Sequence, residues 1–299
     1  MPYLVIAGPT GVGKTEVALD VADAIGGEIV IADSRQVYRG LDVGTAKPTA
    51  AERTRIPHHL IDVVDPGEAY TAADYARDAG RALEAIESRG RVPVVCGGTG
   101  LYLEALAGGL DPMDPVDDAT RERVGAIRLA DRHAELARLD PEAGARLHPH
   151  DRQRVQRALE VRMATGRPLA AYWTGEAAPR PHVAIRLDRP RPELRRRIEE
   201  RLEAMLTAGL EAEARALHAA GWTPADPGVD SIGYQEWWPH FEGRIPREEA
   251  VRRILVATRR YAKRQETWFR RRGRYHPVEA RAGAERVVEI WAGHREDAR

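Results

Sequence analysis

Eight residues near the start of the chain have the spacing of a phosphate-binding loop: Gly8, Pro9, Thr10, Gly11, Val12, Gly13, Lys14 and Thr15. The glycines let backbone N–H groups turn toward phosphate oxygens, and the helix that begins here adds the positive end of its dipole. Lys14 would contribute a point charge, and Thr15 a hydroxyl ligand for Mg²⁺. The usual occupant of such a loop is ATP or GTP, but the pattern itself specifies only phosphate groups.

Two further residues whose side chains could take part in a reaction follow later strands. Asp33 ends the second apolar segment, at the edge where open α/β sheets bind ligands, so it could bind Mg²⁺, act as a general base or only cap a turn. Thr99 lies in the glycine-rich turn CGGTG, where its hydroxyl either caps the next helix or points into the cleft that holds Asp33. Two glycine-lined helix starts beside one carboxylate predict an active site.

The elements that would position these residues alternate between short apolar segments and helical patterns. Strands are expected at 3–7, 28–33, 59–64, 91–96 and 182–188. Helices are expected at about 14–25, from Thr71 to Gly90 with Asp74 completing a capping box, at 101–106, 192–220 and 246–272. The predicted fold class is therefore α/β, a P-loop-containing three-layer fold with a central parallel sheet.

A mostly helical stretch separates the fourth expected strand from the fifth, and it opens with the turn-rich segment DPMDPVDD. We therefore predict a helical insertion domain at 113–180 within a core domain formed by 1–112 and 181–299. The core would end in the basic helices near the C-terminus.

Composition narrows the class of protein. Lys plus Arg and Asp plus Glu both number 46, so the net charge is zero, yet residues 244–274 hold 12 basic residues and three glutamates. Such a concentrated basic segment fits a polyanionic partner. With one cysteine, no leader and no long apolar run, the sequence predicts a cytoplasmic protein without membrane contact, and a monomer by default.

Several motifs and their order along the chain resemble those of the bacterial tRNA dimethylallyltransferase (tRNA isopentenyltransferase) family. These motifs are GPTGVGKT, ADSRQVYRGLDVGTAKP at 32–48, VCGGTGLYLEAL at 95–106, DRQRVQRALEV at 151–161, SIGYQEWW at 231–238 and TRRYAKRQETWFR at 258–270. The resemblance implies transfer of a prenyl group from dimethylallyl diphosphate to the exocyclic amine of the adenine 3′ of the anticodon in tRNA, with Mg²⁺.

The resemblance also implies roles for individual residues. Asp33 becomes the general base, Thr99 a residue of the catalytic channel that also contacts tRNA, and Lys14 with the rest of the loop at 8–15 the diphosphate site. Arg215, in the less distinctive motif EAEARAL, becomes a further diphosphate ligand. The implied tRNA contacts are Asp33, Ser34, Arg35, Gln36, Arg121 in the insertion domain, Gln153, Arg154, Val155, Gln156 and Arg157.

Alternatives remain open from the residues alone. A small-molecule kinase or NTPase would use the same loop, and an RNA-binding module could keep the loop without activity. In the basic helix, Tyr261 and the other apolar residues recur at helical spacing, so that face is expected to pack in the core. The basic residues are then expected on the outer surface, where they would suit RNA phosphates. They are Arg252, Arg253, Arg259, Arg260, Lys263, Arg264 and Arg270. Trp237 and Trp238 could stack on a base, although packing is the commoner use of such a pair.

Overall fold

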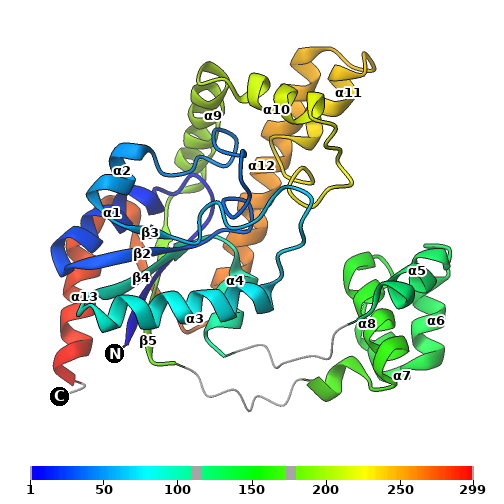
Figure 1. Ribbon diagram of the computed structural model, residues 1–299. Helices are drawn as coiled ribbons and strands as arrows, with labels where there is room; N and C mark the ends of the chain where they lie inside the picture. Colours follow the sequence, from blue (N-terminus) through cyan, green and yellow to red (C-terminus); the bar gives the residue numbers. More distant parts are fainter. Residues whose placement is uncertain (1, 109–115, 173–179, 298–299) are drawn as a thin grey trace. The chain divides into compact units, whose positions relative to one another are not determined.

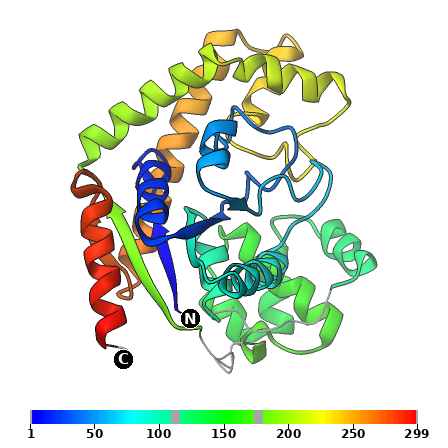
Figure 2. The same ribbon diagram turned by 60° about the vertical axis from the view of Figure 1, so that its left-hand side comes forward.

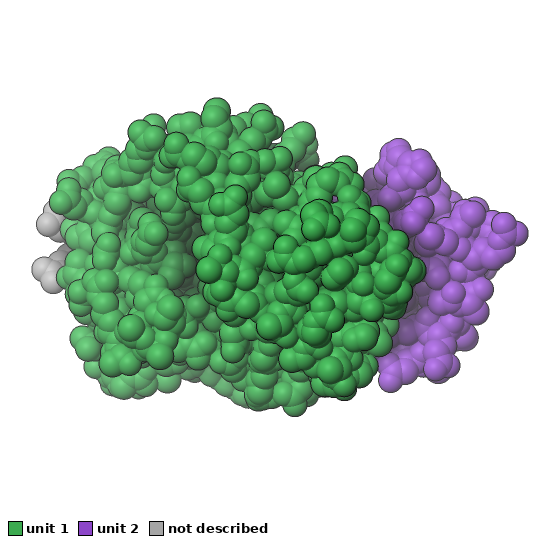
Figure 3. Space-filling model, turned by 90° about the horizontal axis from the view of Figure 1, so that it is seen from above, with its two compact units in different colours: residues 1–107, 180–299 green, residues 108–179 purple. Residues whose placement is uncertain are grey.

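The computed structural model describes residues 2–108, 116–172 and 180–297. The chain divides into two compact units, one made of residues 1–107 and 180–299 and the other of residues 108–179 (Figure 3). The expected start of the insertion at residue 113 lies outside the described residues.

A single parallel sheet is the centre of the first unit, as the sequence predicted (Figure 1). Its order is β3-β2-β4-β1-β5-β6, and every pair of neighbouring strands is parallel. The strands are β1 (Tyr3–Ala7), β2 (Gly27–Ala32), β3 (His58–His59), β4 (Val92–Gly97), β5 (His182–Asp188) and β6 (His276–Glu279). β3 is shorter than predicted and β6 was not predicted, and both form edges of the sheet.

Helices cover both faces of the sheet and complete the three layers (Figure 2). On one face, α1 (Lys14–Ile25) and α13 (Gly283–Asp297) bury residues such as Val21 and Trp291 against the strands. On the other, α3 (Ala72–Ser88) and α4 (Gly100–Leu106) bury residues such as Leu83 and Tyr102. The predicted capping box of α3 is present, because Thr71 and Asp74 each accept the other's backbone N–H.

A third apolar cluster packs the helices α9 (Arg191–Thr207), α10 (Leu210–Ala219), α11 (Trp238–Phe241) and α12 (Arg247–Arg270) together with the loop that follows β2. Figure 1 shows α9, α10 and α12 rising beyond the sheet. The pattern at 192–220 forms two helices because Gly209 turns the chain with a φ of 101°, which disfavours other residues. The short α2 (Ala50–Arg55) follows the loop after β2.

The second unit is helical and has its own small core. Its helices are α5 (Asp118–Ala126), α6 (Arg132–Leu139), α7 (Pro141–Arg146) and α8 (Arg152–Thr165), and their buried side chains include Val124, Leu136 and Leu159. Within the described ranges, no helix of either unit is long and apolar enough to cross a membrane.

Candidate active site

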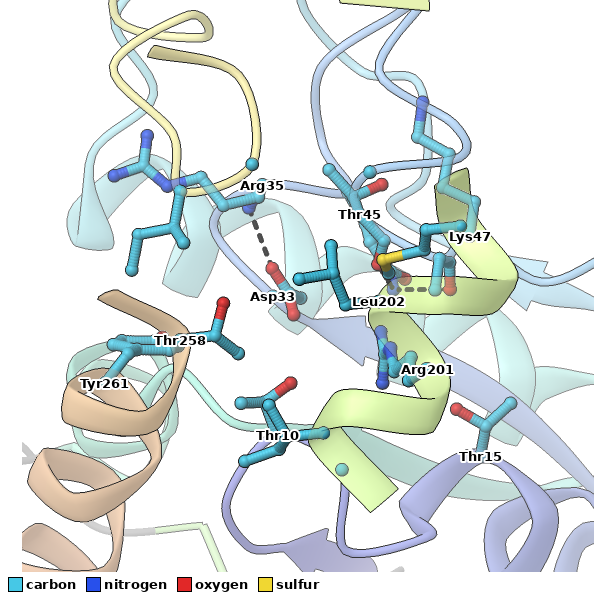
Figure 4. Close-up of a pocket in the computed structure, with 18 of the residues that line it drawn as sticks. Thr10, Thr15, Asp33, Arg35, Thr45, Lys47, Arg201, Leu202, Thr258 and Tyr261 are labelled. Carbon is cyan, nitrogen blue, oxygen red and sulfur yellow. Dashed lines mark hydrogen bonds between the residues drawn. The ribbon is translucent and has the colours of Figure 1, made fainter. Parts of the chain in front are cut away.

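A cavity of about 850 Å³ opens in the first unit, where β1 and β2 end. Figure 4 shows side chains that converge on it from the loop before α1, the end of β2, α9 and α12. Its polar lining includes Thr10, Lys14, Thr15, Asp33, Ser34, Arg35, Gln36, Arg201, Tyr261, Arg264 and Gln265. The cavity therefore joins the predicted phosphate loop to the predicted base.

The phosphate loop is held in shape by its own lysine and by two arginines. Lys14 donates from Nζ to the carbonyl of Pro9 at 2.9 Å. Arg197 and Arg189 donate from Nε to the carbonyls of Gly11 and Val12, at 3.0 Å and 3.1 Å. These bonds occupy carbonyl oxygens that would otherwise repel an anion, and they hold the loop in one shape at the start of α1.

Two cations face the cavity, and no carboxylate among the described residues pairs with either. Burial lowers the pKa of Lys14 to about 8, and the nearby Arg201 lowers it further while Asp33 opposes the shift. Burial also lowers the pKa of Arg201, which in the described part of the chain has neither a hydrogen bond nor an ion pair. Two unneutralised cations beside a phosphate loop make a strong site for a polyanion.

Gln265 of α12 connects the phosphate loop to the second glycine-rich turn. Its Oε1 accepts the backbone N–H of Thr10 at 2.9 Å, and its Nε2 donates to the carbonyl of Gly98 at 2.8 Å. The packing is so close that a β-carbon at Gly98 would overlap the Gln265 amide, and one at Gly100 would overlap the indole of Trp268. The absence of side chains at these glycines of CGGTG therefore allows α12 to pack closely against the turn.

Thr99 lies close to Asp33, and although it is the N-cap residue of α4, its side chain does not cap that helix. Its side chain makes no capping bond to α4, and its Oγ1 instead accepts the backbone N–H of Ser34 at 2.9 Å. One carboxylate oxygen of Asp33, Oδ1, accepts the N–H of Arg35 at 2.8 Å. The carboxylate of Asp33 is thus held by its own turn, and that turn is held at Ser34 by Thr99, which follows the neighbouring strand β4.

The inner face of α12 supplies more of the site than its apolar spacing predicted. Tyr261 lines the cavity, and its burial and the charge of Asp33 raise its pKa to about 12. Arg264, expected on the outer surface, also lines the cavity and lies over the Tyr261 ring at 5.5 Å. Arg264 is exposed, as expected, and it stands at the rim of the cavity as well as on the outer surface.

The loop after β2 forms another wall of the cavity. Gln36 donates to the carbonyls of Thr45 and Ala46 at 3.1 Å and 3.2 Å, which folds the loop back on itself. Lys47 also lines the cavity, but two carboxylates and a backbone carbonyl saturate its ammonium at 2.5–2.6 Å. Lys47 therefore stabilises the loop and offers no free charge to a ligand.

A single carboxylate from α10 ties the same loop to the third apolar cluster. Glu213 accepts the backbone N–H groups of Asp42, Val43 and Gly44 at 2.9 Å, 2.9 Å and 3.1 Å. It also accepts the Tyr234 hydroxyl at 2.6 Å, and burial together with this carboxylate raises the pKa of Tyr234. The cavity wall and α10 are thereby held together.

Arg215 is not where the sequence suggested. It lies on α10 outside the cavity lining, with its guanidinium 4.4 Å from the centre of the Phe241 ring and 3.0 Å from Glu211. Arg201 of α9 is the arginine that faces the loop instead.

The remaining predicted RNA contacts belong to the second unit. Arg121 of α5 is half exposed and pairs with Asp118 at 2.6 Å. On α8, Gln153 and Arg154 are exposed. Gln156 and Arg157 of that helix are engaged with neighbours, and Val155 is buried in the core of the unit. Val155 therefore supports the helix, while Gln153 and Arg154 are free to contact a ligand.

Several of the basic side chains expected to be unpaired on the outer side of α12 form ion pairs with glutamates. Arg252 and Arg253 both pair with Glu249, and Arg259 pairs with Glu199. In the described part of the chain, no ion pair engages Arg260, Lys263 or Arg270. The tryptophan pair is settled as packing, because Trp237 and Trp238 are both buried in the third cluster.

The sequence did not predict Arg201, Gln265 or Glu213 as parts of the site, and it did not predict that Arg264 lines the cavity. Arg197 and Arg201 are four residues apart on α9, so the sequence could predict that they share one face of a helix. It could not predict which part of the molecule that face contacts. In the described ranges no cluster of three or more His, Cys, Asp or Glu side chains forms a metal site.

Comparisons with known proteins agree on one class. The model of the family described as IPP transferase matches residues 36–272, and that described as isopentenyl transferase matches residues 1–63. A tRNA dimethylallyltransferase of Halorhodospira halophila (strain DSM 244 / SL1) is 51% identical over 278 residues, covering 90% of each chain. One from Bordetella petrii (strain ATCC BAA-461 / DSM 12804 / CCUG 43448) is 42% identical, covering 97% of this chain and 98% of its own.

Solved structures give the same result. The tRNA isopentenylpyrophosphate transferase of Bacillus halodurans matches with a TM-score of 0.74 and 36% identity, covering 99% of this chain and 97% of its own. A eukaryotic dimethylallyltransferase described as acting on tRNA matches with a TM-score of 0.81 and 28% identity, covering 93% and 74% of the two chains.

Proposed function

Because this chain belongs to the IPP transferase family, we propose that it transfers a dimethylallyl group from dimethylallyl diphosphate to the exocyclic amine of the adenine 3′ of the anticodon in tRNA. The observation that carries the proposal is a cavity in which the carboxylate of Asp33 faces a phosphate loop and Arg201, a cation that no described residue neutralises. A base and an anion site in one cavity suit a reaction that removes a proton from one substrate and diphosphate from the other.

Asp33 is the general base of this proposal. The exocyclic amine of adenine is a poor nucleophile because its lone pair is delocalised into the ring, so the proton has to leave as the new bond forms. The bond from nitrogen to C1 of the prenyl group forms, the bond from C1 to the diphosphate oxygen breaks, and the amine proton passes to Asp33. Thr99, through its bond to the N–H of Ser34, keeps this turn against β4.

The phosphate loop binds the leaving group. Its N–H groups, Lys14 and Arg201 surround the position where negative charge develops, and they are in place before the reaction begins. Thr15 lines the cavity as an exposed hydroxyl and would be the residue that holds Mg²⁺. The bound ion would neutralise charge on the departing diphosphate.

The RNA is bound by residues of both units in this proposal, and the chain acts as a monomer. Arg35 and Gln36 lie beside Asp33, while Gln153 and Arg154 are exposed on α8 and Arg121 on α5. The target adenine leaves its stack to reach Asp33, which costs less in an anticodon loop than in a duplex.

The test supplies an anticodon stem-loop, Mg²⁺ and either dimethylallyl diphosphate or ATP, and follows the mass of the RNA. We expect one dimethylallyl group to be added, only with the prenyl donor. ATP turnover without modified RNA would support a kinase or NTPase instead. Asp33→Asn should lower single-turnover rates by roughly 10²–10⁴-fold with RNA binding retained, whereas Asp20→Asn on the outer side of α1 should leave both unchanged.

A further inference from the structure

We propose that Leu202 and Met205 of α9 set the length of the prenyl chain that the cavity accepts. The inference rests on the proposed function and concerns the same cavity. Both side chains line it, on the helix that also carries Arg201. They would make the enzyme selective for a five-carbon donor and exclude donors longer by one isoprene unit.

The cavity has a cationic end and an apolar end that follow each other along α9. Its cationic end is at the phosphate loop, where Arg197 donates to the carbonyl of Gly11 and Ile198 packs so closely on Gly11 that a β-carbon there would lie 3.0 Å from it. Arg201 lies about one turn further along the helix, and Met205 lies roughly 10 Å beyond Ile198, at 1.5 Å per residue. A molecule with a diphosphate head and a hydrocarbon tail matches this order.

The donor has only one favourable orientation in such a cavity. The loop N–H groups, Lys14 and Arg201 are all at one end, so the diphosphate is bound there. Burying that charge against Leu202 and Met205 would leave it without partners, which is costly. The hydrocarbon tail therefore extends from the loop toward these two side chains, and its reacting carbon stays near Asp33.

The apolar end is backed by the packed third cluster. Leu202, Leu210 and Ile254 are 7%, 0% and 3% exposed, and all three line the cavity as well as belonging to that cluster. Because this cluster is close-packed, the wall that these side chains form does not move back to lengthen the cavity. Met205 is only partly buried and its side chain is flexible, so it is the position where a substitution disturbs the cluster least.

These two side chains would therefore limit the length of the prenyl group that fits in the cavity. Substituting alanine at both positions removes about as many heavy atoms as one isoprene unit contains, and it removes them at the end of the cavity away from the loop. The chemistry is unchanged, because the bond to C1 forms and breaks at the same place for a longer donor. Only the space for the tail changes.

The experiment measures kcat/KM for dimethylallyl and geranyl diphosphate with an anticodon stem-loop, in the wild type, Met205→Ala and Leu202→Ala/Met205→Ala. We expect the wild type to use dimethylallyl diphosphate far more efficiently than geranyl diphosphate, with a small but measurable kcat/KM for the longer donor. The ratio of geranyl to dimethylallyl transfer should rise roughly ten- to hundredfold in the double variant, and by a smaller factor in Met205→Ala. Glu203→Ala, on the exposed side of the same helix, should leave the ratio unchanged.

The outcomes separate this inference from the proposed function. If the variants still transfer the dimethylallyl group but gain no use of geranyl diphosphate, the length-setting role is wrong while the proposed function stands. If the wild type modifies no RNA with either donor, the proposed function is wrong and the inference falls with it. Should the double variant fail to fold by circular dichroism, Met205→Ala alone decides, and an unchanged ratio in it overturns the inference.

Discussion

Gln265 donates a hydrogen bond to the carbonyl of Gly98 across a contact that leaves no room for a side chain at position 98. The same amide accepts the N–H of Thr10. Two loops that come from separate strands are therefore held at a constant separation by one side chain of α12. One loop carries the anion site, and the other carries Thr99 beside the base.

Gly98→Ala should displace Gln265 and loosen both loops. The backbone at Gly98 has no positive φ, so alanine is tolerated locally and the effect comes from the lost contacts. We expect about 1–3 kcal/mol less free energy of unfolding, typical of a buried hydrogen-bonding group left without a partner, and a lower kcat. Thermal unfolding and single-turnover rates test this. Gly80→Ala is the control, because a β-carbon there would meet nothing within 4 Å.

Arg201 and Arg215 offer a direct comparison of two arginines. Arg201→Ala should raise KM for dimethylallyl diphosphate roughly ten- to hundredfold, the loss expected for a charge-assisted hydrogen bond. Arg215→Ala should change that KM little, because its guanidinium lies over Phe241. Steady-state kinetics at fixed RNA concentration measures both. A larger effect at Arg215 than at Arg201 would show that the helix pair rearranges when the donor binds.

Lys14 makes binding of the donor dependent on pH. Its pKa of about 8 means that the ammonium is charged at neutral pH and loses its charge as the pH rises through that value. KM for the prenyl diphosphate should therefore increase above a pH of about 8. Arg201→Ala should move this increase to higher pH, since Arg201 is one of the groups that lower the pKa of Lys14. A KM that stays flat from roughly pH 7 to about 9.5 would count against Lys14 as a donor ligand.

The same group gives stability the opposite dependence on pH. Between about 8 and the ordinary value of 10.5, the unfolded chain retains the Lys14 proton that the folded chain has released. Because the unfolded state binds more protons there, the contribution of Lys14 to stability rises with pH through this window. Comparing unfolding of the wild type and Lys14→Met across the window isolates this contribution.

RNA binding should weaken steeply as salt rises, and the second unit should contribute to that dependence. Arg154 of α8 is exposed and has only a 3.5 Å pair with Asp151, so Arg154→Ala should lower the slope of log K against log salt by about one. Arg138→Ala is the matched control, because two bonds to Glu135 at 2.9 Å and 2.6 Å already neutralise that arginine. Filter binding of an anticodon stem-loop at several salt concentrations provides the slopes.

Much of the fold follows from local signals in the sequence. Strands such as β1 are short, fully apolar segments, and the helix starts carry glycine or a capping box, so their positions were predictable. β6 was not, because HPVE contains a proline and buries only Val278, which leaves no run of apolar residues to detect. The spacing of Val287 and Trp291 in α13 is helical, but it was overlooked at the end of the chain.

Two parts of the site were predictable: the phosphate loop, which is one continuous segment, and the residues that follow adjacent parallel strands. The phosphate loop and the proximity of Asp33 to Thr99 follow from parallel strands that end at one edge of a sheet. The contact between Thr10 and Gln265 joins residues 255 positions apart, and no periodicity in either segment specifies it. Periodicity placed Arg264 on a polar side of a helix, but it could not tell that this side encloses a cavity.

The position of Gln265 so late in the chain bears on synthesis at the ribosome. GPTGVGKT leaves the ribosome well before β5, which must emerge to pair with β1, and before α12, which supplies the partner of Thr10. Because domains generally fold as their residues leave the ribosome, the loop would gain its final shape only after α12 has been synthesised. Incomplete products would therefore carry the most recognisable motif of the molecule without the capacity to sequester its donor.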